Sequence, residues 1–107
     1  MTNAAKRTVS FTYNVHHAAS AATRAAIALL EDVTYEVGHH DRMAYRGTLS
    51  QWDVVHAAMT ADRDAATGSE KGTLTSALGR IWTTAIVQAE QDARAMRLAA
   101  RRAAAAK

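Results

Sequence analysis

Apolar and polar side chains alternate along one short stretch near the N-terminus, residues 8–15. β-branched and aromatic residues at every second position are typical of a half-buried β-strand. The apolar face consists of Val9, Phe11, Tyr13 and Val15, and the polar face consists of Thr8, Ser10, Thr12 and Asn14. We predict no second strand, and an unpaired strand leaves its backbone groups without partners. We therefore expect this strand to pair with a second copy across a two-fold axis, with its apolar face in the dimer interface.

After the strand, the pattern changes to apolar residues that recur every three or four positions, which is the period of an amphipathic helix. It predicts a first helix over residues 17–37, ended by Gly38, because glycine is favoured just beyond a helix C-terminus. The first half of its apolar face is alanine, and the second half is leucine and valine. Residues 38–47 are predicted to connect this helix to the next.

Two further helices complete the predicted set. The second begins with Ser50 as N-cap and Asp53 at the third helical position, a weak form of the capping box. Its predicted buried stripe is Trp52, Val55 and Met59. Residues 67–72 are a loop by composition. The third helix begins near Thr73, and no helix breaker precedes the C-terminus, so a long helix is expected.

These elements predict an all-α fold of three helices with one short N-terminal β-strand that pairs between protomers. With 107 residues, the chain is expected to form a single domain. Residues 1–7 are expected to be a flexible basic arm that ends in Lys6 and Arg7, and residues 97–107 a projecting or frayed helical tail.

The composition excludes several kinds of site and favours a helical protein. The chain has no cysteine, which excludes disulfides and thiolate metal sites, and it has no proline and 26 alanines, which suits long helices. The formal charge of +3 is a mild basic excess that is compatible with a polyanionic partner. No apolar run approaches the length needed to span a bilayer. We expect a cytoplasmic protein of bacterial or phage type, without a membrane partner.

The basic arm, the alternating strand and the two following helices, residues 6–65, resemble the ribbon-helix-helix family of DNA-binding dimers. In that family, strands from two protomers form an antiparallel ribbon that enters the major groove. The resemblance implies base contacts from Thr8, Ser10, Thr12 and Asn14, and phosphate contacts from Lys6, Arg7, Thr48 and Ser50. The connection over residues 38–47 is longer than the family's short turn. The alternative is a strand that extends a partner's sheet or lies over its own helices.

Histidines and carboxylates give no recognisable catalytic or metal-binding motif. His16 and His17 would lie roughly 30 Å from His39 and His40 along a straight helix, so the two pairs cannot share one site within a chain. The alternative is a weaker possibility, a metal site assembled with an antiparallel neighbour or by His40 folding against His56. No histidine spacing matches a zinc motif. We therefore predict no catalytic residues, no metal and no cofactor.

A row of arginines marks the predicted third helix. Arg94, Arg97 and Arg101 fall on one side of it, which predicts a phosphate-binding stripe, with a solvated helix surface as the alternative. Our first hypothesis is a non-catalytic DNA-binding homodimer, acting in transcription regulation as a repressor or as a plasmid or phage accessory factor. The second is a helical structural or interaction protein that forms an oligomer or binds a protein partner through its strand and long third helix.

Overall fold

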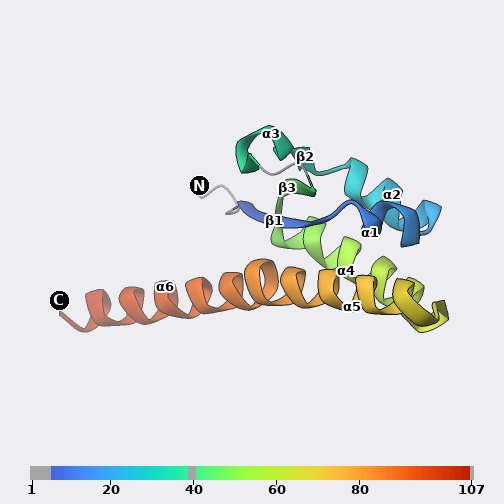
Figure 1. Cartoon of the computed structure of the whole chain (residues 1–107). Coiled ribbons are helices and arrows are strands. Elements are labelled where there is room, and N and C mark those ends of the chain that lie inside the picture. Colours follow the sequence, from blue (N-terminus) through green and yellow to red (C-terminus); the bar gives the residue numbers. More distant parts are fainter. Residues whose placement is uncertain (1–5, 39–40, 107) are drawn as a thin grey trace.

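The N-terminal strand is present, but it pairs within its own chain. A computed structural model describes residues 6–38 and 41–106. Strands β1 (Lys6–Thr12), β2 (Glu31–Asp32) and β3 (Arg42–Thr48) form an antiparallel sheet in the order β1-β3-β2 (Figure 1). The predicted fold class, three helices with one strand that pairs between protomers, is therefore wrong. Lys6 and Arg7, expected in the flexible arm of residues 1–7, belong to β1. The other residues of that arm, 1–5, and the pair His39 and His40 lie outside the described residues.

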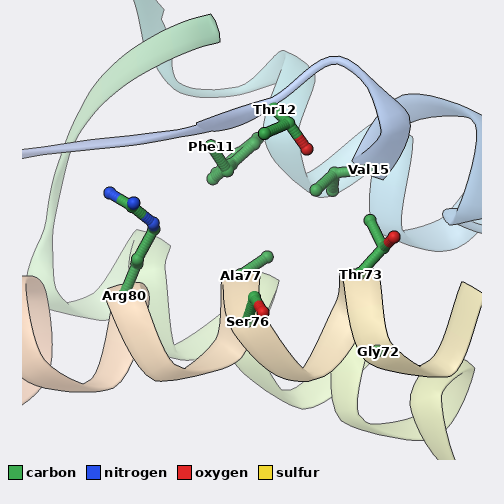
Figure 2. A pocket seen from close by; sticks show the side chains of 8 residues that line it. All are labelled: Phe11, Thr12, Val15, Gly72, Thr73, Ser76, Ala77 and Arg80. Atoms are coloured by element: carbon green, nitrogen blue, oxygen red, sulfur yellow. The ribbon is translucent and has the colours of Figure 1, made fainter. Parts of the chain in front are cut away.

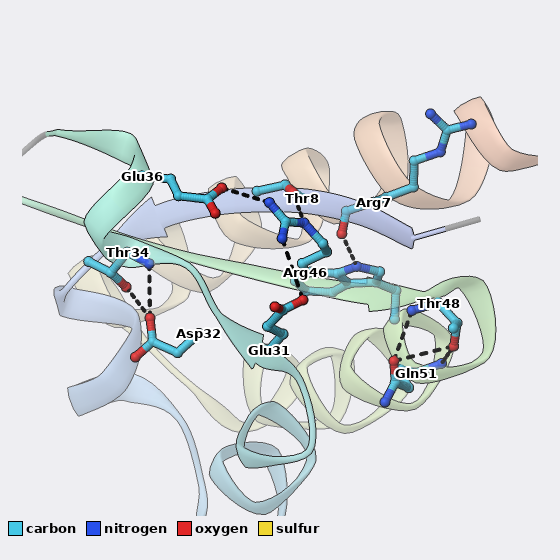
Figure 3. A network of polar contacts seen from close by, with 10 residues as sticks. Arg7, Thr8, Glu31, Asp32, Thr34, Glu36, Arg46, Thr48 and Gln51 are labelled. Carbon is cyan, nitrogen blue, oxygen red and sulfur yellow. Dashed lines mark hydrogen bonds and ion pairs between the residues drawn. The ribbon is translucent and has the colours of Figure 1, made fainter. Parts of the chain in front are cut away.

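Strand β3 occupies the segment that was predicted to be a connection, and it is the central strand of the sheet. Met43 and Tyr45 are buried on the face that meets the core, opposite Phe11 and Val9 of β1. On the other face, Arg46 is held by the carboxylates of Glu36 at 2.6 Å and Glu31 at 3.5 Å (Figure 3). The sequence pattern did not predict this strand, because the arginines on its other face are not the residues that mark a strand.

The predicted helix over residues 17–37 is divided into α1 (Asn14–Ala18), α2 (Ala21–Ala28) and α3 (Thr34–Val37), with β2 before α3. Ser20 interrupts it, because this residue has extended backbone dihedrals and its side chain accepts a hydrogen bond from the Thr23 amide. Serine favours such an N-cap over a helix interior. The predicted stop at Gly38 is confirmed, since Gly38 ends α3 with a left-handed φ of 71°.

Asp62 fastens the start of α2 to the following long helix, α4 (Leu49–Ala65). Its Oδ2 accepts a hydrogen bond from the Ser20 amide at 2.9 Å and another from the Thr23 hydroxyl at 2.5 Å. Burial by itself would raise the pKa of Asp62, but these hydrogen bonds outweigh it and hold the pKa below its ordinary value of 3.8. The folded state is therefore stabilised by the ionised carboxylate.

Replacing this carboxylate should lower the free energy of unfolding at neutral pH and make that free energy less dependent on pH. Because the folded pKa is lowered, the contribution of Asp62 is complete well above pH 3.8 and is lost as the pH falls through the lowered pKa. We expect Asp62→Asn to reduce the free energy of unfolding by about 1–2 kcal/mol at pH 7 and to reduce its dependence on acid. Urea unfolding from pH 7 to pH 3 measures both. The exposed neighbour Asp64→Asn is the control, and an equal loss in that variant would contradict the assignment.

Helix α4 starts two residues earlier than predicted. Thr48 is the N-cap, and its side chain and that of Gln51 accept hydrogen bonds from each other's backbone amides, a complete capping box. Ser50 therefore lies inside the first turn and is exposed. The predicted buried stripe is confirmed, since Trp52, Val55 and Met59 are all fully buried.

A nearly continuous helix follows, made of α5 (Gly68–Ile81), the π-helical segment η1 (Trp82–Val87) and α6 (Gln88–Ala105). It begins within the segment predicted to be a loop. Helices α4 and α5 pack under the sheet, with α4 against β3 and α5 against β1. Their apolar faces and the lower face of the sheet form one core. Beyond the sheet, α6 projects to the C-terminus, which gives the molecule its long dimension of 57 Å (Figure 1).

Candidate functional site

The polar side chains of the N-terminal strand do not form one free row. The Thr8 hydroxyl accepts a hydrogen bond from Nε of Arg46 at 3.3 Å, and Ser10 is half-buried. Thr12 is exposed at the end of β1, and Asn14 belongs to α1 and not to the strand. Thr8, Ser10 and Thr12 thus share one face of β1, whereas Asn14 does not belong to the row that the resemblance to ribbon-helix-helix proteins implied.

The two basic residues at the start of β1 have different surroundings. Lys6 is exposed, whereas Arg7 is half-buried and forms an ion pair with Asp92 of α6. The carbonyl of Arg7 accepts a hydrogen bond from the indole Nε1 of Trp52 at 2.9 Å. Arg7 thus joins β1 to both α4 and α6, while Lys6 faces solvent.

The apolar side of β1 faces the chain's own core. Val9 and Phe11 are buried against the helices, as is Val15 of α1, and Phe11 stacks on Tyr45 with ring centroids 5.8 Å apart. Tyr13 is the exception, with an exposed fraction of 42%. The burial of the first three side chains needs no second copy.

The N-terminus of α4 is capped by side chains of its own first turn. Thr48 is half-buried, and both its amide and its hydroxyl lie within hydrogen-bonding distance of the Gln51 side chain. Only Ser50 of this pair of predicted phosphate contacts is exposed.

The arginines of α6 lie on the part of the chain that projects from the body. Arg94, Arg97 and Arg101 are exposed, as is Arg102, and no acidic residue follows Asp92 in the sequence. Five of the 13 basic residues lie in residues 94–107, which leaves eight basic and ten acidic residues in the remainder of the chain. Positive charge is therefore concentrated at one end of an otherwise slightly acidic protein.

A groove of about 410 Å³ lies between the outer edge of β1 and helix α5, and sequence patterns gave no signal for it. Figure 2 shows Phe11 and Thr12 on the strand side and Ser76, Ala77 and Arg80 on the helix side. Thr73, Gly72 and Val15 close its far end. Its walls combine an apolar floor, several hydroxyl groups and one guanidinium.

The histidines that the structure describes are not grouped into a metal-binding site. No group of three histidine, cysteine or carboxylate side chains within residues 6–38 and 41–106 could hold a metal ion. His56 packs beside Trp82, with ring centroids 5.8 Å apart, and burial lowers its pKa despite the opposing charge of Asp53. His16 and His17 are exposed on α1.

Comparison with known proteins gives no family for this chain. No protein-family model, curated protein or solved structure matches it. Functional inference therefore rests on the chemistry and geometry of its own residues. Among the described residues, no helix has both the length and the apolar character that crossing a membrane requires.

Proposed function

We propose that this chain is a small, non-catalytic DNA-binding protein whose helix α6 contacts the phosphate backbone of double-stranded DNA. The observation that carries the proposal is the concentration of exposed arginines on a projecting helix that has no acidic residue after Asp92. Arginine is suited to this role because its planar guanidinium donates two parallel hydrogen bonds to phosphate oxygens.

The spacing of the arginines supports contact along one side of the helix. Arg94, Arg97 and Arg101 are separated by three and four residues, so they share one side over roughly 10 Å of helix. Phosphate contacts of this kind carry no sequence information by themselves. The proposal therefore assigns no base reading to Thr8, whose hydroxyl accepts a hydrogen bond from Arg46, or to the half-buried Ser10.

Removing the arginines should weaken DNA binding and its dependence on salt. We expect the triple variant Arg94→Gln, Arg97→Gln, Arg101→Gln to bind a 20-base-pair duplex at least tenfold more weakly at low salt. The slope of log affinity against log salt concentration should fall by up to about 3, at roughly 0.9 for each phosphate that an arginine no longer neutralises. Fluorescence anisotropy at several salt concentrations measures both quantities.

A matched variant removes the same charge elsewhere. Arg24→Gln, Arg63→Gln, Lys71→Gln lowers the net charge equally but leaves α6 intact. This control should retain most of the affinity and the full salt slope. Equal losses in the two triple variants would show that net charge alone drives binding and would contradict a role for α6.

A helical interaction protein is the second candidate, and two exposed apolar side chains on α6, Met96 and Leu98, favour it. A wild-type protein that sediments as a stable oligomer and binds no duplex at any salt concentration would support this candidate over DNA binding.

A further inference from the structure

We infer that the groove between β1 and α5 binds an extended acidic peptide from a protein partner, which adds to the sheet as a strand next to β1. This site is separate from the arginines of α6 and does not depend on DNA binding. Four observations carry the inference: an open strand edge, the lateral offset of α5, the lining of the groove and its charge.

The outer edge of β1 has backbone groups without partners in the described residues. Ala44 of β3 lies opposite Ser10. The backbone groups of Ala44 point away from β1, because its carbonyl accepts from the Val33 amide at 2.9 Å and its amide donates to the Thr34 hydroxyl at 3.3 Å. Alternation in an antiparallel pair then turns the backbone groups of Thr8, Ser10 and Thr12 away from β3. These are the groups that an added strand would bond.

Typical helix and strand spacings place α5 further out than the edge strand β1, with room for one more strand above it. Helices α4 and α5 pack together under β3 and β1 respectively. Packed helices are about 8–10 Å apart, whereas neighbouring strands are about 4.7–4.9 Å apart. A two-fold copy of β1 in this place would bring its own α5 into the space that this α5 occupies. We therefore commit to a single peptide strand as the occupant.

The groove lining indicates the chemistry of that peptide. Phe11 and Ala77 form a buried apolar floor, which suits one apolar side chain of the added strand. Ser76 offers a hydroxyl group along the α5 wall, whereas the Thr73 hydroxyl donates to the Ser69 carbonyl at 3.0 Å. Arg80 lies at the end nearest the start of β1. The groove lining includes no carboxylate, and Arg80 forms no ion pair with any described residue. An aspartate or glutamate side chain, or a C-terminal carboxylate, would complement this charge.

Selection from a phage library of random heptapeptides on the immobilised full-length chain provides the probe. We expect enriched sequences that combine acidic with β-branched residues, and we would synthesise the strongest for anisotropy measurements. Ser76→Trp should fill the groove and weaken peptide binding at least tenfold. Thr75→Trp, on the adjacent exposed position of α5 outside the groove, should bind as the wild type does. Arg80→Glu should also weaken binding, whereas Arg24→Glu should not.

Amide hydrogen exchange in the wild-type protein tests the strand geometry without any variant. Saturating peptide should slow exchange at the Ser10 and Thr12 amides, because both would donate to the added strand. Failure to enrich any sequence, equal binding by the two tryptophan variants, or unchanged exchange at both amides would overturn the inference. A wild-type dimer that Ser76→Trp alone dissociates would also overturn it, because the occupant would then be a second copy. None of these variants changes α6, so the outcome is independent of the DNA-binding test.

Discussion

Trp52→Ala is expected to lose about 3–5 kcal/mol of unfolding free energy, the typical cost of removing a buried tryptophan side chain. The side chain is fully buried in α4 under the sheet, and its Nε1 donates to the carbonyl of Arg7 at 2.9 Å. A domain of this size has only about 5–15 kcal/mol of total stability, so the variant should be largely unfolded at moderate urea concentrations. Urea denaturation followed by circular dichroism measures the loss.

Two matched variants separate packing from hydrogen bonding. Trp52→Phe keeps most of the apolar contact but removes the donor to Arg7, and should lose roughly 1–3 kcal/mol. Trp82→Ala removes the second tryptophan, which is 50% exposed, and should lose clearly less than Trp52→Ala. Equal losses at the two tryptophans would contradict the placement of Trp52 at the centre of the core.

Gly47→Ala is expected to destabilise the protein by about 1–3 kcal/mol, although alanine usually improves on glycine inside a strand or helix. A Cβ atom at Gly47 would overlap with Cδ2 of the buried Leu30 and would lie 3.0 Å from Oε1 of Gln51. That oxygen accepts a hydrogen bond from the Thr48 amide in the capping box of α4. The added methyl group would thus disturb both the core and the start of α4. Thermal and urea unfolding would show the loss.

Gly79→Ala is the control for this prediction. Nothing lies within 4 Å of a Cβ atom built at Gly79, which is exposed near the end of α5, where the helix continues into η1. The same substitution there should therefore stabilise the protein by about 0.5–1 kcal/mol. Opposite signs at the two glycines are expected, and a gain at Gly47 would mean that the contact with Leu30 relaxes without cost.

Sequence patterns predicted the helices and strands that are determined by residues close together in the sequence. The alternation near the N-terminus marked a strand at Lys6–Thr12, although its bounds were shifted and its partner was wrong. The three-and-four spacing in α4 identified its buried stripe correctly, and the absence of a breaker indicated a long C-terminal helix. In each case, the residues that determine the element lie within a few positions of one another.

The elements that were missed depend on contacts between distant residues. Strand β3 has two arginines on one face, and one of them, Arg46, is stabilised there by Glu31 and Glu36. The break before α2 combines the local N-cap of Ser20 with a contact to Asp62, 42 residues away from Ser20. Helical propensity in an alanine-rich segment is a weak preference that such contacts override. A single sequence gives no indication of which distant side chains will meet.

The same distinction applies to the candidate sites. The arginine row on α6 follows from helical spacing alone and could be predicted. The groove beside β1 could not, because it requires knowing that β3 covers one edge of β1 and that α5 lies beyond the other. Its lining residues belong to two segments that are about sixty positions apart.

The projecting helix also gives the molecule a direction. Because residues 94–107 carry the net positive charge and the rest of the chain has a slight excess of acidic residues, opposite net charges are separated along the molecule and form an electric dipole. In the field of a polyanion, such a dipole experiences a torque before any contact forms. The protein should therefore approach with α6 leading and the sheet trailing. Most diffusional encounters would then begin in one orientation, and raising the salt concentration would remove this alignment before it abolished contact.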